Sequence, residues 1–228
     1  MKYRGYTIEQ IAKVIDHTVL KPTATEADIR MVCEQALKFD TASACIRPMD
    51  VKQAASILAN SSVDVATVIG FPHGTTTTEA KVAESHKAIA DGANELDMVL
   101  NISQLLDQKY DQVFSDIEAV VNAAEGKATV KVIFETCYLT DSLIARACEL
   151  SEKAGAHFVK TSTGFATGGA TIENIQLMRR SVGNRLGVKA SGGIRTLDAL
   201  IDMLEAGANR IGTSNTEAIL AEFEQLAE

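Results

Sequence analysis

Lys160 is the residue of this sequence whose surroundings point most directly to chemistry. It follows the short apolar run 156–159 and precedes a turn rich in hydroxyl groups and glycine, residues 161–165. Such a run is typical of a buried strand that leads into a loop. Burial lowers the pKa of a lysine, and the neutral amine is a nucleophile toward carbonyls. By itself, the stretch favours a strand-end lysine whose stem is buried while its ammonium reaches water.

The elements that must position Lys160 alternate along the chain between apolar runs and amphipathic stretches. The apolar runs of strand length are residues 14–20, 41–46, 63–70, 93–100, 129–135, 156–161, 186–190 and 209–212. The stretches with helical character are residues 25–39, 51–59, 79–90, 103–125, 140–153, 171–181, 196–205 and 216–226. Residues 7–14 predict one further short helix, with Thr7 as its N-cap and Gln10 at the capping-box position.

This alternation predicts a closed α/β barrel. A glycine stands between a helix and a strand in residues 91–93, 154–156 and 206–208, where it fits the left-handed position that ends a helix. Eight βα units without a proline- or glycine-rich linker predict a (β/α)8 TIM barrel as a single domain over residues 1–228. A doubly wound open sheet is the alternative, but no GxGxxG motif follows the first strand.

A barrel brings the carboxyl ends of its strands together, so we expect the catalytic groups there. Lys189 occupies on the next strand the position that Lys160 holds on its own. Adjacent parallel strands lie about 4.8 Å apart, so two inward-pointing lysines would be neighbours. Like charges at that separation leave one amine neutral, which suits Schiff-base chemistry. The alternative is that one lysine points outward between the helices.

Asp97 is an acidic residue inside the apolar run 93–100. A carboxylate there is costly unless it is paired, and lysines across the barrel would pair it. It could shuttle protons during imine chemistry, directly or through water. A purely structural ion pair is the alternative, because ion-pair networks also shift pKa values.

Two glycine-rich turns, residues 191–195 and 212–215, follow the last two predicted strands and precede helices. Backbone N–H groups at helix N-termini bind phosphate, and the loops after strands seven and eight are the usual phosphate site of these barrels. Thr163 and Gly164 could add a third wall. The sequence therefore predicts a phosphate pocket beside the lysines.

The composition excludes several classes of protein. The 228 residues are 46% hydrophobic and 23% charged, and the net charge of −8 argues against non-specific binding to nucleic acid or anionic membranes. The four cysteines form no CxxC or disulfide pattern, residues 1–6 lack a signal-peptide core, and no apolar run reaches transmembrane length. We therefore expect a cytoplasmic protein. The four scattered histidines form no metal-ligand motif, so no metal is expected.

Six motifs together resemble those of the deoxyribose-phosphate aldolases. They are DHT at 16–18, VIGFPHG at 68–74, ELDMV at 95–99, VKVIFET at 130–136, FVKTSTGF at 158–165 and VKASGGIR at 188–195. Order and spacing agree with the family from about residue 15 to residue 214. As a set, these motifs are highly specific.

The resemblance implies a class I aldolase that reversibly cleaves 2-deoxy-D-ribose 5-phosphate to D-glyceraldehyde 3-phosphate and acetaldehyde, without a metal or other cofactor. It identifies Lys160 as the Schiff-base lysine, Lys189 as the lysine that lowers its pKa and Asp97 as the acid–base group. The implied substrate-binding residues are Asp16, Thr18, Lys131, Thr161, Gly164, Gly192, Gly193, Arg195, Gly212 and Ser214.

Two positions depart from some relatives: Phe165 stands where a basic residue occurs, and Asn215 where a second serine occurs. The expected partners are phosphorylated sugar and aldehyde substrates and further copies of the chain, as a dimer or tetramer. Two other functions are kept as alternatives: a class I aldolase with a different donor, and a non-catalytic barrel that binds a sugar phosphate. Retention of both lysines and Asp97 argues against the second alternative.

Overall fold

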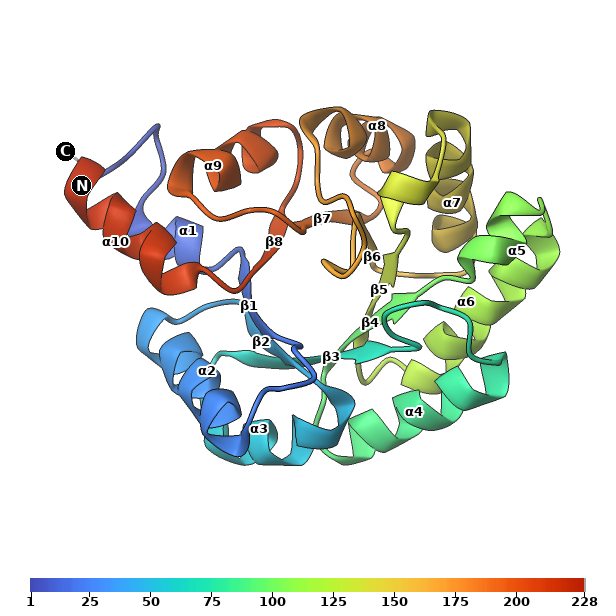
Figure 1. The fold of residues 1–228 in the computed structure, drawn as a ribbon, viewed down its shortest axis with the longest axis horizontal. Helices are drawn as coiled ribbons and strands as arrows, with labels where there is room; N and C mark the ends of the chain where they lie inside the picture. The colour runs from blue at the N-terminus through green and yellow to red at the C-terminus, as the bar shows by residue number, and fades with distance from the viewer. Residues whose placement is uncertain (228) are drawn as a thin grey trace.

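Eight parallel strands close into a barrel in chain order, and β8 completes the closure by pairing with β1 (Figure 1). The computed structural model describes residues 1–227; Glu228, the last residue of the predicted domain, lies outside them. The strands are β1 Ile15–Val19, β2 Ser43–Ile46, β3 Asp64–Ile69, β4 Glu95–Val99, β5 Thr129–Ile133, β6 Phe158–Lys160, β7 Gly187–Ser191 and β8 Arg210–Thr213. The predicted TIM barrel is confirmed, and an open sheet is excluded.

Helices surround the barrel on all sides (Figure 1). They are α1 Ile8–Ala12, α2 Glu26–Phe39, α3 Val51–Ile57, α4 Thr78–Ala90, α5 Ile102–Leu106, α6 Tyr110–Ala124, α7 Asp141–Lys153, α8 Ile172–Val182, α9 Leu197–Glu205 and α10 Thr216–Leu226, with 3-10 turns η1 Pro48–Asp50 and η2 Thr136–Tyr138. The predicted extra N-terminal helix is α1, which packs against α10. Within residues 1–227, no helix has the length and apolar character needed to cross a bilayer.

The helix ends follow from local sequence. The Thr7 side chain accepts a hydrogen bond from the N–H of Gln10, and the Gln10 side chain accepts one from the N–H of Thr7, so the predicted capping box is formed. Gly92, Gly155 and Gly207 have φ of 110°, 82° and 117°. These are the left-handed conformations predicted for the glycines that end helices.

One predicted helix is divided in two. The structure breaks the stretch 103–125 between α5 and α6, and Gln108 in the break has a left-handed φ of 58°. No glycine or proline marks this break in the sequence. The turn lets α5 pack against both α6 and α7. The prediction of a mainly helical segment is confirmed, but its division depends on tertiary packing.

The two faces of the barrel strands have opposite character. On β4, Leu96 and Met98 belong to the apolar core between barrel and helices, whereas the alternate residues Glu95 and Asp97 are buried charged residues. The barrel interior of such a fold is usually filled by branched apolar side chains. Here a small cluster of Cys45, Ala66 and Val68 is separate from the main core, and charged groups occupy much of the interior. The apolar core between the strands and the helices therefore supplies the stability of the fold, and the interior is available for chemistry.

A buried ion pair fixes the helices that cover β4. The ammonium of Lys81 on α4 is fully buried, 2.5 Å from the Asp116 carboxylate on α6, and it donates to the backbone oxygen of Val99 at 2.9 Å. Thr78 also donates to Asp116, at 2.8 Å. This network joins α4, α6 and the carboxyl end of β4, where the strand leaves the barrel.

Replacing Lys81 with methionine is expected to lower the free energy of unfolding by about 3–5 kcal/mol, because it leaves the Asp116 charge buried and unpaired. Urea unfolding followed by circular dichroism measures this change. The matched control is Lys87→Met on the same helix, since Lys87 is largely exposed and pairs with Asp91 at the surface. The effect of this control should stay below about 1 kcal/mol. Equal effects of the two substitutions would contradict a stabilising role of the buried pair.

Candidate active site

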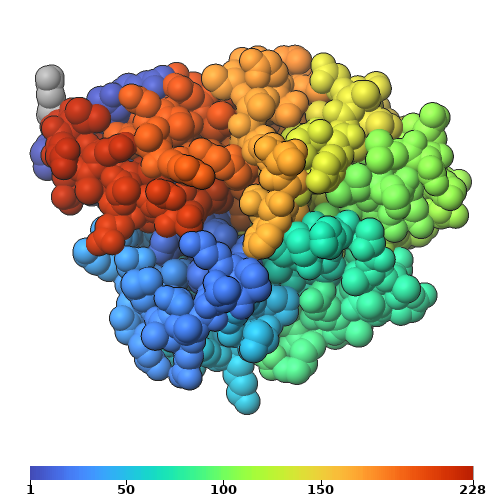
Figure 2. Space-filling view, viewed as in Figure 1, coloured from blue at the N-terminus to red at the C-terminus, as the bar shows by residue number. Residues whose placement is uncertain are grey.

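A cavity of about 730 Å³ opens at the carboxyl ends of the strands. Its wall is formed mainly by the segments that follow β1, β6, β7 and β8 and by one face of α2. Figure 2 shows the segment after β6, in orange, crossing the middle of this face. The predicted site residues that line the cavity are Thr18, Lys160, Gly164, Gly192, Gly193, Arg195, Gly212 and Ser214.

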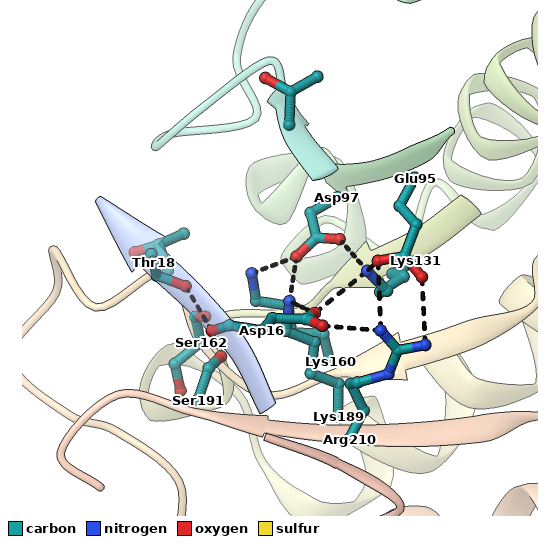
Figure 3. Close-up of polar contacts among 12 residues, drawn as sticks. Asp16, Thr18, Glu95, Asp97, Lys131, Lys160, Ser162, Lys189, Ser191 and Arg210 are labelled. Atoms are coloured by element: carbon teal, nitrogen blue, oxygen red, sulfur yellow. Dashed lines mark hydrogen bonds and ion pairs between the residues drawn. The ribbon is translucent and has the colours of Figure 1, made fainter. Parts of the chain in front are cut away.

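Lys160 and Lys189 are direct partners in the pairing of β6 with β7. Both point into the barrel, because both ammonium groups contact the same carboxylate oxygen, Oδ2 of Asp97, at 2.6 and 2.7 Å (Figure 3). The alternative in which one lysine points outward is therefore excluded. Asp97 lies in the middle of β4 and is fully buried. The structure brings together the three residues predicted to carry the chemistry.

Asp16 and Lys131 extend this network deeper into the barrel. Lys131 lies 3.0 Å from Oδ1 of Asp97 and 3.2 Å from Asp16, and Lys189 contacts the same oxygen of Asp16. Both residues are fully buried and neither lines the cavity. Thr161 is also buried off the cavity, where its hydroxyl donates to the backbone oxygen of Ser191 at 3.0 Å. These three residues therefore support the cavity floor from below.

The sequence analysis missed two charged residues of this network. Arg210 donates to Oδ1 of Asp16 at 2.7 Å and lies 3.1 Å from Glu95, whose other oxygen is 2.5 Å from Lys131. Each is the first residue of its strand. The period of two along a strand places Glu95 on the face of Asp97, and Arg210 on that of Gly212. That alternation was the available signal, but only the closed barrel brings these two side chains together.

The three buried lysines differ in pKa. Burial lowers the pKa of Lys160, Asp97 opposes this, and Lys189 lowers it further, so the net shift is downward. Burial also acts to lower the pKa of Lys189, but Asp16 and Asp97 outweigh it and the net shift is upward. The pKa of Lys131 is likewise raised, against burial, by carboxylates. Lys160 is therefore the lysine that most readily becomes neutral, and it alone of the three lines the cavity.

Asp97 and Asp16 are carboxylates at neutral pH. Burial acts to raise the pKa of Asp97, but the three lysines together hold it well below the usual value. The pKa of Asp16 is also lowered, because Lys131, Lys189 and Arg210 outweigh the effect of burial. Two buried negative charges therefore lie beneath Lys160.

A buried carboxylate positions the loop after Lys160. The Glu135 side chain accepts hydrogen bonds from both the N–H and the hydroxyl of Thr163, and the N–H of Phe165 donates to that hydroxyl oxygen at 3.1 Å. Glu135 itself has a left-handed φ of 57°. Ser191 fixes the other side of the loop by donating to the backbone oxygen of Ser162 at 2.6 Å. The loop over the cavity is thus held from β5 and β7.

One side of the cavity has the features of an anion site. Gly164, Gly192 and Gly193 have φ of 83°, 85° and 84°, which favour glycine, and within residues 1–227 their N–H groups donate to no protein acceptor. Asn215 is the N-cap residue of α10, and its side chain makes no capping hydrogen bond, so this helix N-terminus is open to a ligand. Free N–H groups and an uncapped helix start favour negative charge. Arg195 adds a cation to the lining.

Part of the cavity lining is apolar and includes Val19, Leu20 and Phe165. The rings of Phe71 and Phe165 meet edge to face, with centroids 5.3 Å apart. Phe71 and Leu20 pack on the interior cluster of Cys45, Ala66 and Val68. The cavity therefore offers a polar end and an apolar wall around one reactive amine.

In the described residues, no three His, Cys, Asp or Glu side chains are arranged to hold a metal ion.

The comparisons with known proteins agree with this geometry. Residues 10–220 match the sequence profile of the DeoC/LacD family aldolases. The chain is 58% identical over 215 residues to deoxyribose-phosphate aldolase of Bacillus cytotoxicus, covering 94% of this chain and 96% of that one, and 54% identical over 211 residues to that of Clostridium perfringens, covering 92% and 94%. The tetrameric deoxyribose phosphate aldolase structure from Aeropyrum pernix superimposes with a TM-score of 0.90 at 33% identity, covering 97% and 94%. The chain therefore belongs to the DeoC/LacD family of aldolases.

Proposed function

We propose that this protein is a class I aldolase that reversibly cleaves 2-deoxy-D-ribose 5-phosphate to D-glyceraldehyde 3-phosphate and acetaldehyde. The observation that carries the proposal is the environment of Lys160. Its amine is buried, has a lowered pKa and lines the cavity. It donates a hydrogen bond to Asp97 and lies beside Lys189 on the next strand. The relatives bearing the name deoxyribose-phosphate aldolase supply the substrate.

The first step is attack of the neutral Lys160 amine on the aldehyde carbon of the open-chain sugar. Loss of water from the carbinolamine gives a protonated imine on Lys160. The Asp97 carboxylate, 2.6 Å from Nζ of Lys160, is placed to receive and return the protons of this dehydration, directly or through a water. Lys189 stays protonated and favours the neutral form of Lys160.

Carbon–carbon cleavage then uses the imine as an electron sink. Asp97, directly or through a water, removes the proton of the C3 hydroxyl, and the freed O–H electron pair forms the C3 carbonyl. The C2–C3 bond breaks, and the electron pair of that bond moves toward the imine to give an enamine on Lys160. D-glyceraldehyde 3-phosphate leaves, C2 takes up a proton, and water hydrolyses the acetaldehyde imine. Buried carboxylates stabilise the cationic imine by preorganised charge.

The phosphate of the substrate occupies the anion site at the polar end. Its partners are the N–H groups of Gly164, Gly192, Gly193 and Ser214, together with the Arg195 guanidinium. Because Phe165 cannot donate to phosphate, this binding depends on backbone groups and Arg195. We also infer a cytoplasmic homo-oligomer, dimer or tetramer: the four cysteines are free, and the Aeropyrum pernix relative is tetrameric.

Borohydride reduction in the presence of acetaldehyde is expected to leave an ethyl group on Lys160, found by peptide mass spectrometry. Lys160→Ala should abolish both the adduct and turnover without changing the circular dichroism spectrum. A label on Lys189 alone would mean that the roles of the two lysines are reversed. An unlabelled protein, beside a working control aldolase, would refute the proposed function and leave a binding barrel or a different donor.

Lys189→Leu is expected to move the acidic limb of the kcat/KM profile to higher pH by about one unit or more. The positive charge of Lys189 lowers the pKa of Lys160. Removing Lys189 therefore raises the pKa of Lys160, and the variant loses activity at a higher pH than the wild type does. The matched control is Lys52→Leu, which removes an exposed lysine of α3. A profile unmoved by Lys189→Leu would exclude the electrostatic role.

Arg195→Gln is expected to raise KM for the phosphorylated sugar about 10- to 100-fold with little change in kcat, because a charge-assisted hydrogen bond contributes about 1.5–3 kcal/mol. Cleavage of unphosphorylated 2-deoxyribose should be unaffected. Arg30→Gln, at an exposed arginine of α2 that does not line the cavity, is the control. Equal losses with both sugars would place Arg195 outside the phosphate site.

A further inference from the structure

Seven charged side chains form one connected network inside the barrel (Figure 3). They are Asp16, Glu95, Asp97, Lys131, Lys160, Lys189 and Arg210, and the ion pairs between them link β1, β4, β5, β6, β7 and β8. Six are buried, and only 15% of the Arg210 side chain is exposed. We call this set the charge network. It holds three acidic and four basic groups, so it is neutral only when one basic group has lost its proton.

The contacts identify the group that loses the proton. Lys131 contacts three carboxylates, and Lys189 and Arg210 contact two each, whereas Lys160 contacts only Asp97. An arginine in a protein stays protonated. A net charge in a buried site is costly, so neutrality is favoured. Neutral Lys160 therefore balances the network, and it is also the member that lines the cavity.

We propose that Arg210 and Glu95 are positioning residues that set the protonation state of Lys160 through the charge balance of the network. Neither touches Lys160 or lines the cavity, and each begins its strand at the opposite end of the barrel. Arg210 supplies the third permanent positive charge, which makes neutral Lys160 the balanced state. Glu95 supplies a negative charge, which favours the protonated form of Lys160. The inference rests on the proposed function only in taking Lys160 as the amine that forms the imine.

Geometry holds both residues in place. The Arg210 guanidinium lies between Asp16 at 2.7 Å and Glu95 at 3.1 Å, and it stacks on the Phe158 ring with its central carbon 5.5 Å from the centroid. Gly187 makes this possible, because a Cβ there would collide with the Phe158 ring. Glu95 has a cation on each oxygen, Arg210 and Lys131, which assigns it as a carboxylate. Burial, which Lys131 and Arg210 only partly offset, gives Glu95 a net upward shift in pKa.

The protonation of Lys160 depends on every titratable group that faces it. Asp97 on β4 contacts it, Lys189 on β7 contacts the same Asp97 oxygen, and the thiol of Cys45 on β2 is close enough to affect its pKa. Burial raises the pKa of Cys45, so this thiol is neutral and adds no charge. Asp16 and Lys131 lie behind Asp97 and are permanently charged. The two residues that begin β4 and β8 complete the set, and their removal shifts Lys160 in opposite directions.

Four variants test the proposal: Arg210→Met, Glu95→Gln, the double variant and Arg210→Lys. The readout is the rate at which cyanoborohydride traps acetaldehyde on Lys160 as a function of pH. Arg210→Met should raise the midpoint by about one pH unit, the effect of a unit charge over roughly 10 Å at an effective dielectric constant of about 20. Glu95→Gln should lower it by a similar amount. The double variant and Arg210→Lys should titrate close to the wild type.

A merely structural role predicts a different result. It would lower the maximal rate and the unfolding midpoint of both single variants without moving their pH midpoints in opposite directions. Midpoints that stay unmoved, or move in the same direction, overturn the charge-balance proposal. If Arg210→Met does not fold, Glu95→Gln still tests the direction of the midpoint shift, and Arg210→Lys remains the control that keeps the charge. A wild type that gives no Lys160 adduct overturns the proposed function instead, so the two failures are distinguishable.

Discussion

One carboxylate, Asp97, joins all the chemistry of this barrel. Its oxygen Oδ2 accepts from Lys160 and Lys189, and Oδ1 accepts from Lys131, so three ammonium groups from neighbouring strands meet on one side chain. Without that carboxylate, three buried ammonium groups would repel one another in a site with little water. With it, only Lys160 lacks a second carboxylate partner. The difference between three chemically identical lysines is thus one of neighbours, and it distinguishes Lys160, the amine that we propose as the nucleophile.

This arrangement requires a fold that does not depend on its barrel interior for stability. The outward faces of the strands and the surrounding helices form the large apolar core, in which Leu96, Val130 and Val188 are fully buried. The interior can then hold a connected set of charges, which contribute little net stability but fix one arrangement of side chains. The closed sheet also satisfies the backbone of every strand, so no edge competes for the inward-pointing groups. Stability and reactivity are therefore separated between the two faces of the same strands.

The local signals in the sequence were sufficient for the architecture. Threonine caps such as Thr7, the left-handed glycines Gly92, Gly155 and Gly207, and the eight apolar runs predicted the order of elements that the structure contains. The break at Gln108 was not predictable, because nothing in that residue type favours a left-handed backbone. It exists because α5 must turn to pack on α6 and α7.

The order of the strands and the placement of Lys160 and Lys189 at one level of adjacent strands were predictable from the sequence, because strand period and order follow from local pattern. The contacts of both ammonium groups with Asp97 were needed to exclude an outward-pointing lysine. The tertiary structure alone decided the rest of the charge network. Glu95 and Arg210 are 115 residues apart, and closure of β8 onto β1 places Arg210 between Asp16 and Glu95. Likewise, the unequal number of carboxylates around each lysine is a property of contacts across the barrel. The sequence shows which strand carries a charged residue. The neighbours that set the pKa of that residue come together only when the sheet closes.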